Sequence, residues 1–197
     1  MFKGKRLAGF LAVIAAAVVV AAFSGSLRAE GDRIASVAQA PEKSNQAEMS
    51  NEIWVAVSRD RNSVWAISKE TGAWEKITLQ NPGKQPIDIE SSRNVACVSF
   101  GNDVYAFSAL TGAWEKITLE NPGEQTVSFE CGSDVADLSF GNDVHAFSAV
   151  TGTWDTLHLD APAEPSIGNG WVYLEVGTEL HVFTAKTGKW ESVDLAE

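Results

Sequence analysis

Four copies of one short sequence pattern recur at a nearly fixed spacing, and this repetition restricts the fold more than any other feature of the chain. Each copy runs from an apolar segment through a Thr-Gly pair to a tryptophan two residues after the glycine. The recurring residues are Gly72, Gly112, Gly152, Gly188, Trp74, Trp114, Trp154 and Trp190. The tryptophans lie 40, 40 and 36 residues apart. A β-type pattern with a period of about 40 residues is typical of repeat proteins whose units stack on one another, such as propeller blades.

One repeat contains four short runs of strand-forming residues separated by turn-forming Gly, Asn, Asp and Pro. In the second copy the runs are Val95–Phe100, Val104–Ser108, Trp114–Leu119 and Thr126–Glu130. Tight turns between short apolar runs predict antiparallel strands, and they leave no room for a helix. Bulky residues on both faces of the second run predict that each sheet is covered on both sides by neighbouring sheets.

The predicted fold is all-β: a four-repeat β-propeller-like array of antiparallel four-stranded blades that follows an N-terminal hydrophobic helix. The repeats are expected at about 52–93, 94–133, 134–169 and 170–197. The fourth blade is expected to lack an outer strand, because the chain ends soon after its third strand. We interpret the recurring glycines and tryptophans as structural, since the blade itself explains a residue that every copy contains.

The segment Val104–Trp114 resembles the second-to-third strand segment of a kelch repeat in its aromatic residues, its Thr-Gly turn and its tryptophan. It is also similar to the blade motif of quinoprotein-type propellers, and the resemblance covers about residues 52–197. A propeller fold is what this resemblance implies. The diglycine of kelch strands is absent, and Phe100-Gly101 and Phe140-Gly141 stand in its place. No residues match the quinone-binding residues of quinoprotein enzymes, so that chemistry is not carried over.

The N-terminal segment has the composition of an export signal or a membrane anchor. Basic residues within 3–6 precede an uncharged stretch, rich in Ala and Val, over residues 7–27. Apolar regions of signal peptides have about 7–15 residues and a spanning helix needs about 20, so the length leaves both alternatives open. We expect residues 1–29 to be a signal peptide or membrane anchor, 30–51 a flexible linker and 52–197 the repeat domain. The domain is then periplasmic or extracellular, either secreted or tethered to the membrane.

The charge of the repeat domain limits the classes of partner. Residues 51–197 carry 9 basic and 22 acidic side chains, a net charge of −13. Nucleic-acid binding depends on Lys and Arg that displace phosphate counterions, so no nucleic-acid partner is expected. Contact with a membrane is expected only through the N-terminal segment, if that segment is not cleaved. A protein or glycan partner and a homodimer both stay open.

No motif for catalysis, metal binding or cofactor binding is found in the sequence. The histidines lack the spacing of a zinc site, and His145 and His181 occupy the position that Trp65 and Tyr105 fill in the other copies. There is no G-x-S-x-G segment and no Ser–His–Asp set. We therefore expect no catalytic residue, no metal and no cofactor.

The two cysteines, Cys97 and Cys131, are expected to be buried free thiols, with a disulfide as the alternative in an oxidising compartment. Cys97 lies in the first strand of its repeat and Cys131 closes the last strand. These would be the inner and outer strands of one blade, and a disulfide cannot span Cα atoms more than about 7 Å apart.

Segments that do not recur between copies are the candidates for a binding surface. They are the segments expected to connect one blade with the next, and their polar residues are Arg93, Asn94, Ser133, Asp134 and Asn169. In propellers such connections gather on one face around the central channel, where loops on a rigid scaffold carry recognition. Their polar side chains suit a glycan or an extended peptide, and unconstrained loops without a ligand are the alternative. Replacing Arg93, Asn94, Asp134 and Asn169 together with alanine is expected to weaken binding and to leave the melting temperature nearly unchanged.

Three functional classes fit the sequence. The leading prediction is an exported, non-enzymatic binding or scaffold module on a small β-propeller, with an unknown partner. The alternatives are a structural, self-assembling envelope domain, in which two chains form one larger propeller, and a degenerate member of an enzyme-bearing propeller family. Closure of four blades alone and pairing of two chains are both compatible with the range of about four to eight blades in natural propellers.

Overall fold

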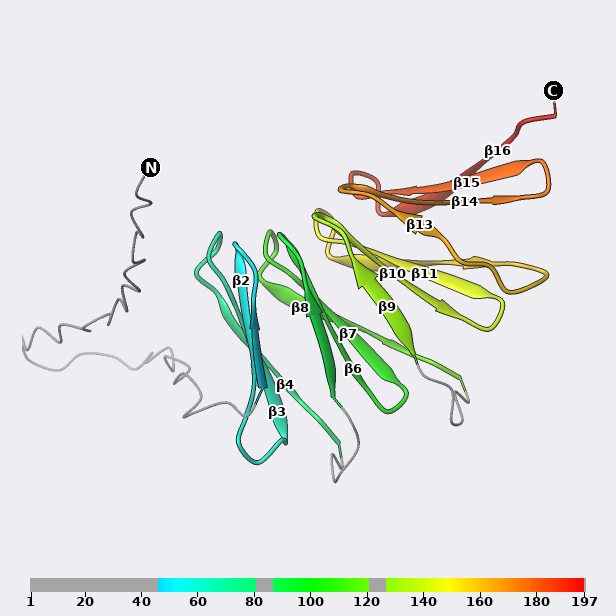
Figure 1. Ribbon diagram of the computed structural model, residues 1–197. Helices are drawn as coiled ribbons and strands as arrows, with labels where there is room; N and C mark the ends of the chain where they lie inside the picture. The colour runs from blue at the N-terminus through cyan, green and yellow to red at the C-terminus, as the bar shows by residue number, and fades with distance from the viewer. Residues whose placement is uncertain (1–45, 81–86, 121–126, 197) are drawn as a thin grey trace, which may run out of the picture. The chain divides into compact units, whose positions relative to one another are not determined.

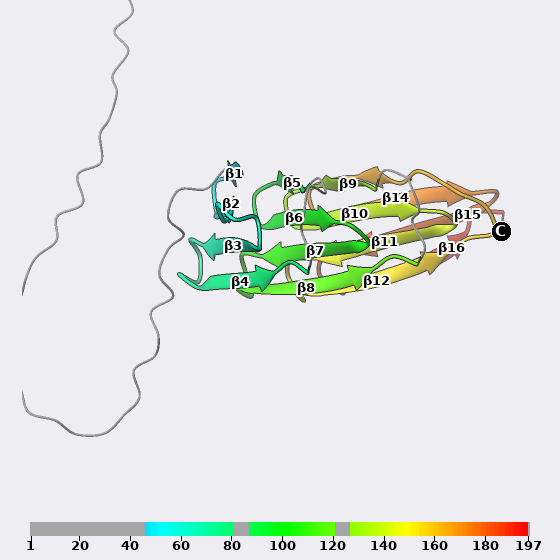
Figure 2. The same cartoon turned by 90° about the horizontal axis from the view of Figure 1, so that it is seen from below.

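The structure is a computed structural model and describes residues 46–80, 87–120 and 127–196. In these residues every regular element is a β-strand, and the strands form four antiparallel four-stranded sheets. Each sheet is a meander of four consecutive strands, and we call the sheets blades 1 to 4 in chain order (Figure 1). Figure 2 shows the first strands of successive blades following one another, as the fourth strands do. The predicted array of four four-stranded blades is confirmed.

The strands have similar lengths in all blades, with one exception in blade 4. Blade 1 has β1 (Gln46–Met49), β2 (Ile53–Val57), β3 (Ser63–Ser68) and β4 (Trp74–Thr78). Blade 2 has β5 (Asp88–Ser91), β6 (Val95–Phe100), β7 (Asp103–Ser108) and β8 (Ala113–Thr118). Blade 3 has β9 (Ser128–Cys131), β10 (Val135–Phe140), β11 (Asp143–Ser148) and β12 (Thr153–His158). Blade 4 has β13 (Ser166–Ile167), β14 (Trp171–Val176), β15 (Glu179–Thr184) and β16 (Lys189–Asp194). The short β13 follows Pro165, which cannot donate a backbone hydrogen bond to a neighbouring strand.

The blades differ from the expected repeats by one strand. The run Thr126–Glu130 is expected to close the second blade, but β9 pairs with β10 and therefore belongs to blade 3. In the same way β13 is the first strand of blade 4, so the expectation that this blade lacks a strand is wrong. The turns explain the shift. The Gly132 N–H donates to the Val135 carbonyl oxygen at 2.8 Å, which closes a tight hairpin and pairs β9 with the strand that follows it.

The segment expected to be a linker ends in a strand. Residues 46–49 of the range 30–51 form β1, which pairs with β2 and places Glu48 opposite Val55. The expected signal or anchor segment over 1–29, with its hydrophobic helix, lies outside the described residues. Within the residues described, no helix is long and apolar enough to cross a membrane.

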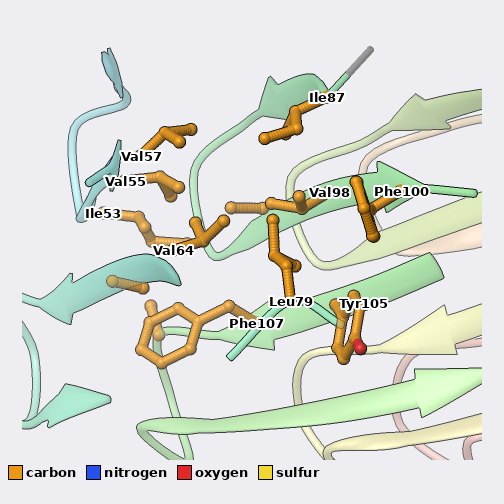
Figure 3. Close-up of a cluster of buried hydrophobic side chains, with 13 residues drawn as sticks. Ile53, Val55, Val57, Val64, Leu79, Ile87, Val98, Phe100, Tyr105 and Phe107 are labelled. Carbon is orange, nitrogen blue, oxygen red and sulfur yellow. The ribbon is translucent and has the colours of Figure 1, made fainter. Parts of the chain in front are cut away.

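Successive blades pack through two different faces of each sheet. We call the face toward the next blade the trailing face and the face toward the previous blade the leading face. Between blades 1 and 2, Val55 and Val64 on the trailing face pack with Val98 and Phe107 on the leading face (Figure 3). All four side chains are fully buried. Strand contacts join blade 1 to 2, 2 to 3 and 3 to 4, and no comparable contact joins blades 1 and 4 in the described part of the chain.

The recurring tryptophans are partly buried and pack on the leading faces, each beside another large ring. Ring centroids are 5.2, 5.3 and 5.7 Å apart in the pairs Phe107–Trp114, Phe147–Trp154 and Phe183–Trp190. In blade 1 the partner differs, because Trp74 packs edge to face on Trp54 at 5.7 Å. Such aromatic pairs stabilise a core beyond the area that they bury. The structure therefore places these tryptophans in packing between and within blades.

The Thr-Gly pair acts between blades as well as in its own turn. Gly112 has a φ of 70°, the left-handed conformation that favours glycine. A Cβ atom on Gly112 would also lie 2.8 Å from Oγ1 of Thr71 in blade 1. The same close approach recurs at the next two junctions, in the pairs Thr111–Gly152 and Thr151–Gly188. Glycine is therefore required twice, by the turn and by the threonine of the preceding blade.

A buried serine hydroxyl also joins each blade to the next. Ser108 Oγ donates to the Ala149 carbonyl oxygen at 2.6 Å and accepts from the backbone N–H of Thr111 at 3.1 Å. Equivalent bonds to the next blade are Ser68 to Ala109 at 2.5 Å and Ser148 to Ala185 at 2.6 Å. All three junctions therefore share one set of contacts.

Candidate functional site

The polar residues predicted for binding lie in the turns between the first and second strands of blades 2, 3 and 4. Arg93 and Asn94 are in the β5–β6 turn, Ser133 and Asp134 in the β9–β10 turn, and Asn169 in the β13–β14 turn. Each turn belongs to a single blade, so the expectation that these segments connect one blade with the next is wrong. The reason is the one-strand shift of the repeat described above. We call these five residues the turn row.

Hydrogen bonds link the turn row from blade to blade. The Asn94 N–H donates to the Ser133 carbonyl oxygen at 2.8 Å, and Asn94 Nδ2 donates to Asp134 Oδ1 at 2.5 Å. The Asp134 N–H donates to the Asn169 carbonyl oxygen at 2.8 Å. Alanine at Asn94 or Asp134 would remove a bond between blades, so an unchanged melting temperature is no longer expected. A role of the turn row in binding stays a prediction.

A cavity beside β9 and β10 contains a buried carboxyl group that the sequence analysis did not single out. The cavity has a volume of about 340 Å³ and is lined by Ser128, Phe129, Glu130, Asp137, Ser139, Glu164 and Pro165. Asp137 is only 6% exposed. Burial, and then the Glu130 and Glu90 carboxylates, raise the pKa of Asp137 to about 7. The sequence did contain a signal for this group. Asp137 stands at a strand position that the uncharged residues Cys97 and Tyr173 fill in the neighbouring blades.

The two buried histidines each have a hydroxyl partner on the neighbouring strand. His145 Nδ1 is 2.8 Å from Thr156 Oγ1, and His181 Nδ1 is 2.6 Å from Ser192 Oγ. Both side chains are 7% exposed, and burial lowers the pKa of His145. The two residues belong to different blades and do not form a joint site. In the residues that the structure describes, no group of His, Cys, Asp or Glu is arranged to hold a metal ion.

The two cysteines are free thiols, but they are neighbours across the junction of blades 2 and 3. The Cys131 N–H donates to Glu90 Oε1 at 3.0 Å, and Glu90 is the cross-strand partner of Cys97. The adjacent Cys97 thiol, and then burial, raise the pKa of the Cys131 thiol well above its usual range. The expectation that they lie on distant strands of one blade is wrong, because Cys131 belongs to blade 3.

The trailing face of blade 4 exposes apolar side chains. They are Trp171 (57% exposed), Tyr173 (41%), Val193 (52%) and Leu195 (57%). In blade 2 the residues equivalent to Trp171 and Tyr173 are Val95 and Cys97, both fully buried under blade 3. A contiguous exposed apolar patch is a mark of an interaction surface. The sequence signal was two aromatic residues at alternate positions of a strand where the other copies have smaller, non-aromatic residues.

The leading face of blade 1 is the second terminal blade face. A hollow of about 280 Å³ lies there, lined by Met49, Ser50, Asn51, Glu52, Ile53, Trp54, Ile67 and Lys69. Met49 is 76% exposed, and Ile67 is half-buried whereas its equivalent Phe107 is fully buried. A Cβ atom on Gly72 would meet no atom within 4 Å, in contrast to Gly112. This face therefore has the room that a preceding blade fills at the other junctions.

Comparisons with known proteins identify no family for this chain. No family model matches the sequence, and no curated protein matches it. The chain is similar in structure to Kluyvelomyces marxianus Hsv2, with 16% identity and a TM-score of 0.36. The match covers 73% of this chain and 46% of the Hsv2 chain. It is also similar to a chain of the S. cerevisiae complex of Dbp5 with Nup159, Gle1, IP6 and ADP, with 12% identity, a TM-score of 0.34, and coverage of 72% and 40%. A third similar chain is apo AztD from Citrobacter koseri, with 10% identity, a TM-score of 0.36, and coverage of 76% and 46%.

This chain spans less than half the length of each of these three solved chains. Kelch or quinoprotein membership of the blades stays a prediction.

Proposed function

We propose that this chain is a non-enzymatic binding or scaffold module that holds a protein partner on the trailing face of blade 4. The observation that carries the proposal is the exposure of Trp171 and Tyr173, at 57% and 41%, on one face of β14. Both rings come from a strand in a hydrogen-bonded sheet, so little conformational entropy is lost when a partner covers them. Large aromatic side chains in such positions dominate the binding energy of protein interfaces.

The polar groups of the blades support binding rather than catalysis. Ser108 and Asn94 are bonded across blade junctions, and His145 is bonded to a cross-strand hydroxyl. These groups therefore stabilise the stack of blades.

The proposal places the blades outside the cytoplasmic membrane. Its support is the N-terminal sequence, in which basic residues precede the uncharged stretch over 7–27. A reporter enzyme that is active only after export, fused behind residue 197 of the full chain, should be active in the producing cells. An inactive reporter in a stably expressed fusion would contradict export without affecting the binding proposal.

Photochemical cross-linking in the producing cells tests the binding surface. A photoactivatable phenylalanine analogue in place of Tyr173 should form a covalent adduct on illumination, because a partner covers this position. The control carries the same analogue in place of Leu110, which is 39% exposed in a turn of blade 2. Equal yields at both positions, or no adduct at position 173, would refute docking on this face.

A further inference from the structure

The three junctions between blades repeat one set of contacts, and the two halves of a fourth set lie at opposite ends of the array. At each internal junction a serine hydroxyl of one blade donates to an alanine carbonyl of the next. A threonine of the first blade also lies against a glycine of the second. Apolar side chains fill the space between these polar links. A surface that offers one half of this set is thus shaped for a blade.

The trailing half of the set is present on blade 4. Thr184 takes the position of Ser148, and Thr187 takes the position of Thr151. At the internal junctions these hydroxyls reach the next blade. On blade 4 the Thr184 and Thr187 hydroxyl oxygens are instead 2.9 Å from each other, in an exposed pair. The hydroxyl donor and the threonine of the repeated set are therefore both available at this end.

The leading half of the set is present on blade 1. Lys69 takes the position of Ala109, and in both residues the backbone N–H donates at 2.9 Å to the carbonyl just before the second strand of the blade. The Lys69 carbonyl therefore corresponds to the acceptor of the serine bond. Gly72 has a φ of 69° and open space where a Cβ would lie, whereas the same space at Gly112 holds a threonine. Blade 1 thus offers an acceptor and a vacant threonine position.

The apolar surfaces of the two ends also correspond. Trp171, Tyr173, Val193 and Leu195 are exposed on the trailing face, and Met49, Trp54 and Ile67 line the hollow on the leading face. At the internal junctions these two sets of positions pack against each other and are largely buried. Contact between the two terminal faces would continue an existing interface rather than create a new type.

We infer that the partner of the trailing face is a second copy of this chain, which docks the leading face of its blade 1 on blade 4 of the first. The reciprocal contact closes two chains into one assembly of eight blades, within the range of about four to eight blades in natural propellers. The occupant is a second copy because the leading face of blade 1 offers the acceptor, the open glycine and the apolar hollow that complete the repeated set. Within one chain, strand contacts join only successive blades in the described residues. This inference rests on the proposed function and names its partner.

Two complementary variants test the head-to-tail arrangement with the full chain in detergent. The trailing-face variant carries Trp171→Glu and Tyr173→Glu, and the leading-face variant carries Met49→Glu and Ile67→Glu. Each variant retains only one competent face, so each alone should have half the protein mass of the wild-type dimer by light scattering. An equimolar mixture should recover a one-to-one dimer, because the intact leading face of one variant meets the intact trailing face of the other.

The control for surface charge carries Leu110→Glu and Val150→Glu, at exposed positions in turns of blades 2 and 3, and should remain dimeric. Circular dichroism of every variant should show unchanged β structure. A monomeric wild-type chain would overturn the inference, because it means closure within one chain or no closure. Dimers of either variant alone would also overturn it, because they require contact between identical faces.

The cross-linking experiment separates this inference from the proposed function. An adduct of position 173 with residues near Ile67 of another copy supports both. An adduct with a different protein supports the binding module and refutes self-assembly. No adduct at all refutes both.

Discussion

The same strand positions have opposite environments in blades 3 and 4. On the trailing face of blade 3, Val135 and Asp137 are 0% and 6% exposed, whereas the matching Trp171 and Tyr173 of blade 4 are 57% and 41% exposed. A carboxyl group is therefore buried where two large aromatic rings are exposed. The neighbour makes the difference, since blade 4 covers blade 3 and no strand in the described residues covers blade 4. In a stack of repeats, burial follows from the place in the array more than from the hydrophobicity of the residue.

Truncation of an internal ring should show the largest effect. Phe147 is fully buried and packs on Trp154, so Phe147→Ala should lower the free energy of unfolding by about 3–5 kcal/mol. The matched change on the terminal face, Trp171→Ala, should lower it by less than about 1 kcal/mol under conditions where the chain is monomeric. Urea unfolding of the full chain, followed by circular dichroism, measures both. Similar losses for the two variants would mean that the terminal face is covered within the monomer.

The buried carboxyl group should make stability depend on pH. Because the pKa of Asp137 is about 7 in the folded chain and near 4 when unfolded, the folded state binds an extra proton between these values. The contribution of Asp137 to the free energy of unfolding is therefore largest below about pH 4, falls as the pH rises to about 7, and does not change at higher pH. Asp137→Asn removes the ionisation and should raise stability by about 4 kcal/mol at pH 8, but by only about 1–2 kcal/mol at pH 5. Urea unfolding at pH 5 and pH 8 measures the difference. An equal effect of the substitution at both values would contradict the assignment.

Most of the fold follows from the sequence because each blade repeats the same local signals. The alternating apolar runs and the Thr-Gly turns depend on nearest neighbours in the chain, so they predict strands and turns directly. The shift by one strand was missed because the pairing of a strand such as β9 depends on which of its two connections, the one before it or the one after it, forms a tight hairpin. The short turn after Cys131 decides it, and its Gly132–Val135 hydrogen bond is seen only in the structure.

The candidate surface was less predictable for a physical reason. Repetition identifies what the blades share, but the exposure of Trp171 depends on whether a neighbouring blade covers it, which no local pattern encodes. The turn row illustrates the converse. Asn94 and Asp134 do not recur, yet they bond to each other across a junction. Residues that differ between copies can therefore still be structural.

The hydroxyl that joins one blade to the next should also contribute more to stability at an internal junction than on blade 4, with a smaller difference than for the aromatic rings. Ser108→Ala removes the buried bond to the Ala149 carbonyl oxygen and leaves that oxygen without this donor, so it should cost about 2 kcal/mol of stability. Thr184→Ala changes the equivalent, half-buried position, whose hydroxyl lies in an exposed pair with that of Thr187, and should cost less than about 0.5 kcal/mol in the monomer. Thermal and urea unfolding of both variants test the contrast. If the chain dimerises as inferred, the cost of Thr184→Ala should rise with protein concentration, while that of Ser108→Ala should not.

The smallest contrast lies within one turn. Asn94 bonds to Asp134 of the next blade, so Asn94→Ala should lower the free energy of unfolding by about 1 kcal/mol. Its neighbour Arg93 has an exposed side chain and contributes its backbone carbonyl to the contact with Ser50, so Arg93→Ala should change stability by less than about 0.5 kcal/mol. Urea unfolding of the two variants, at one pH and one protein concentration, gives the comparison. If the turn row also binds a ligand, Arg93→Ala should weaken that binding at unchanged stability. Equal stability of both variants would mean that the side-chain bond between Asn94 and Asp134 does not help to hold blades 2 and 3 together.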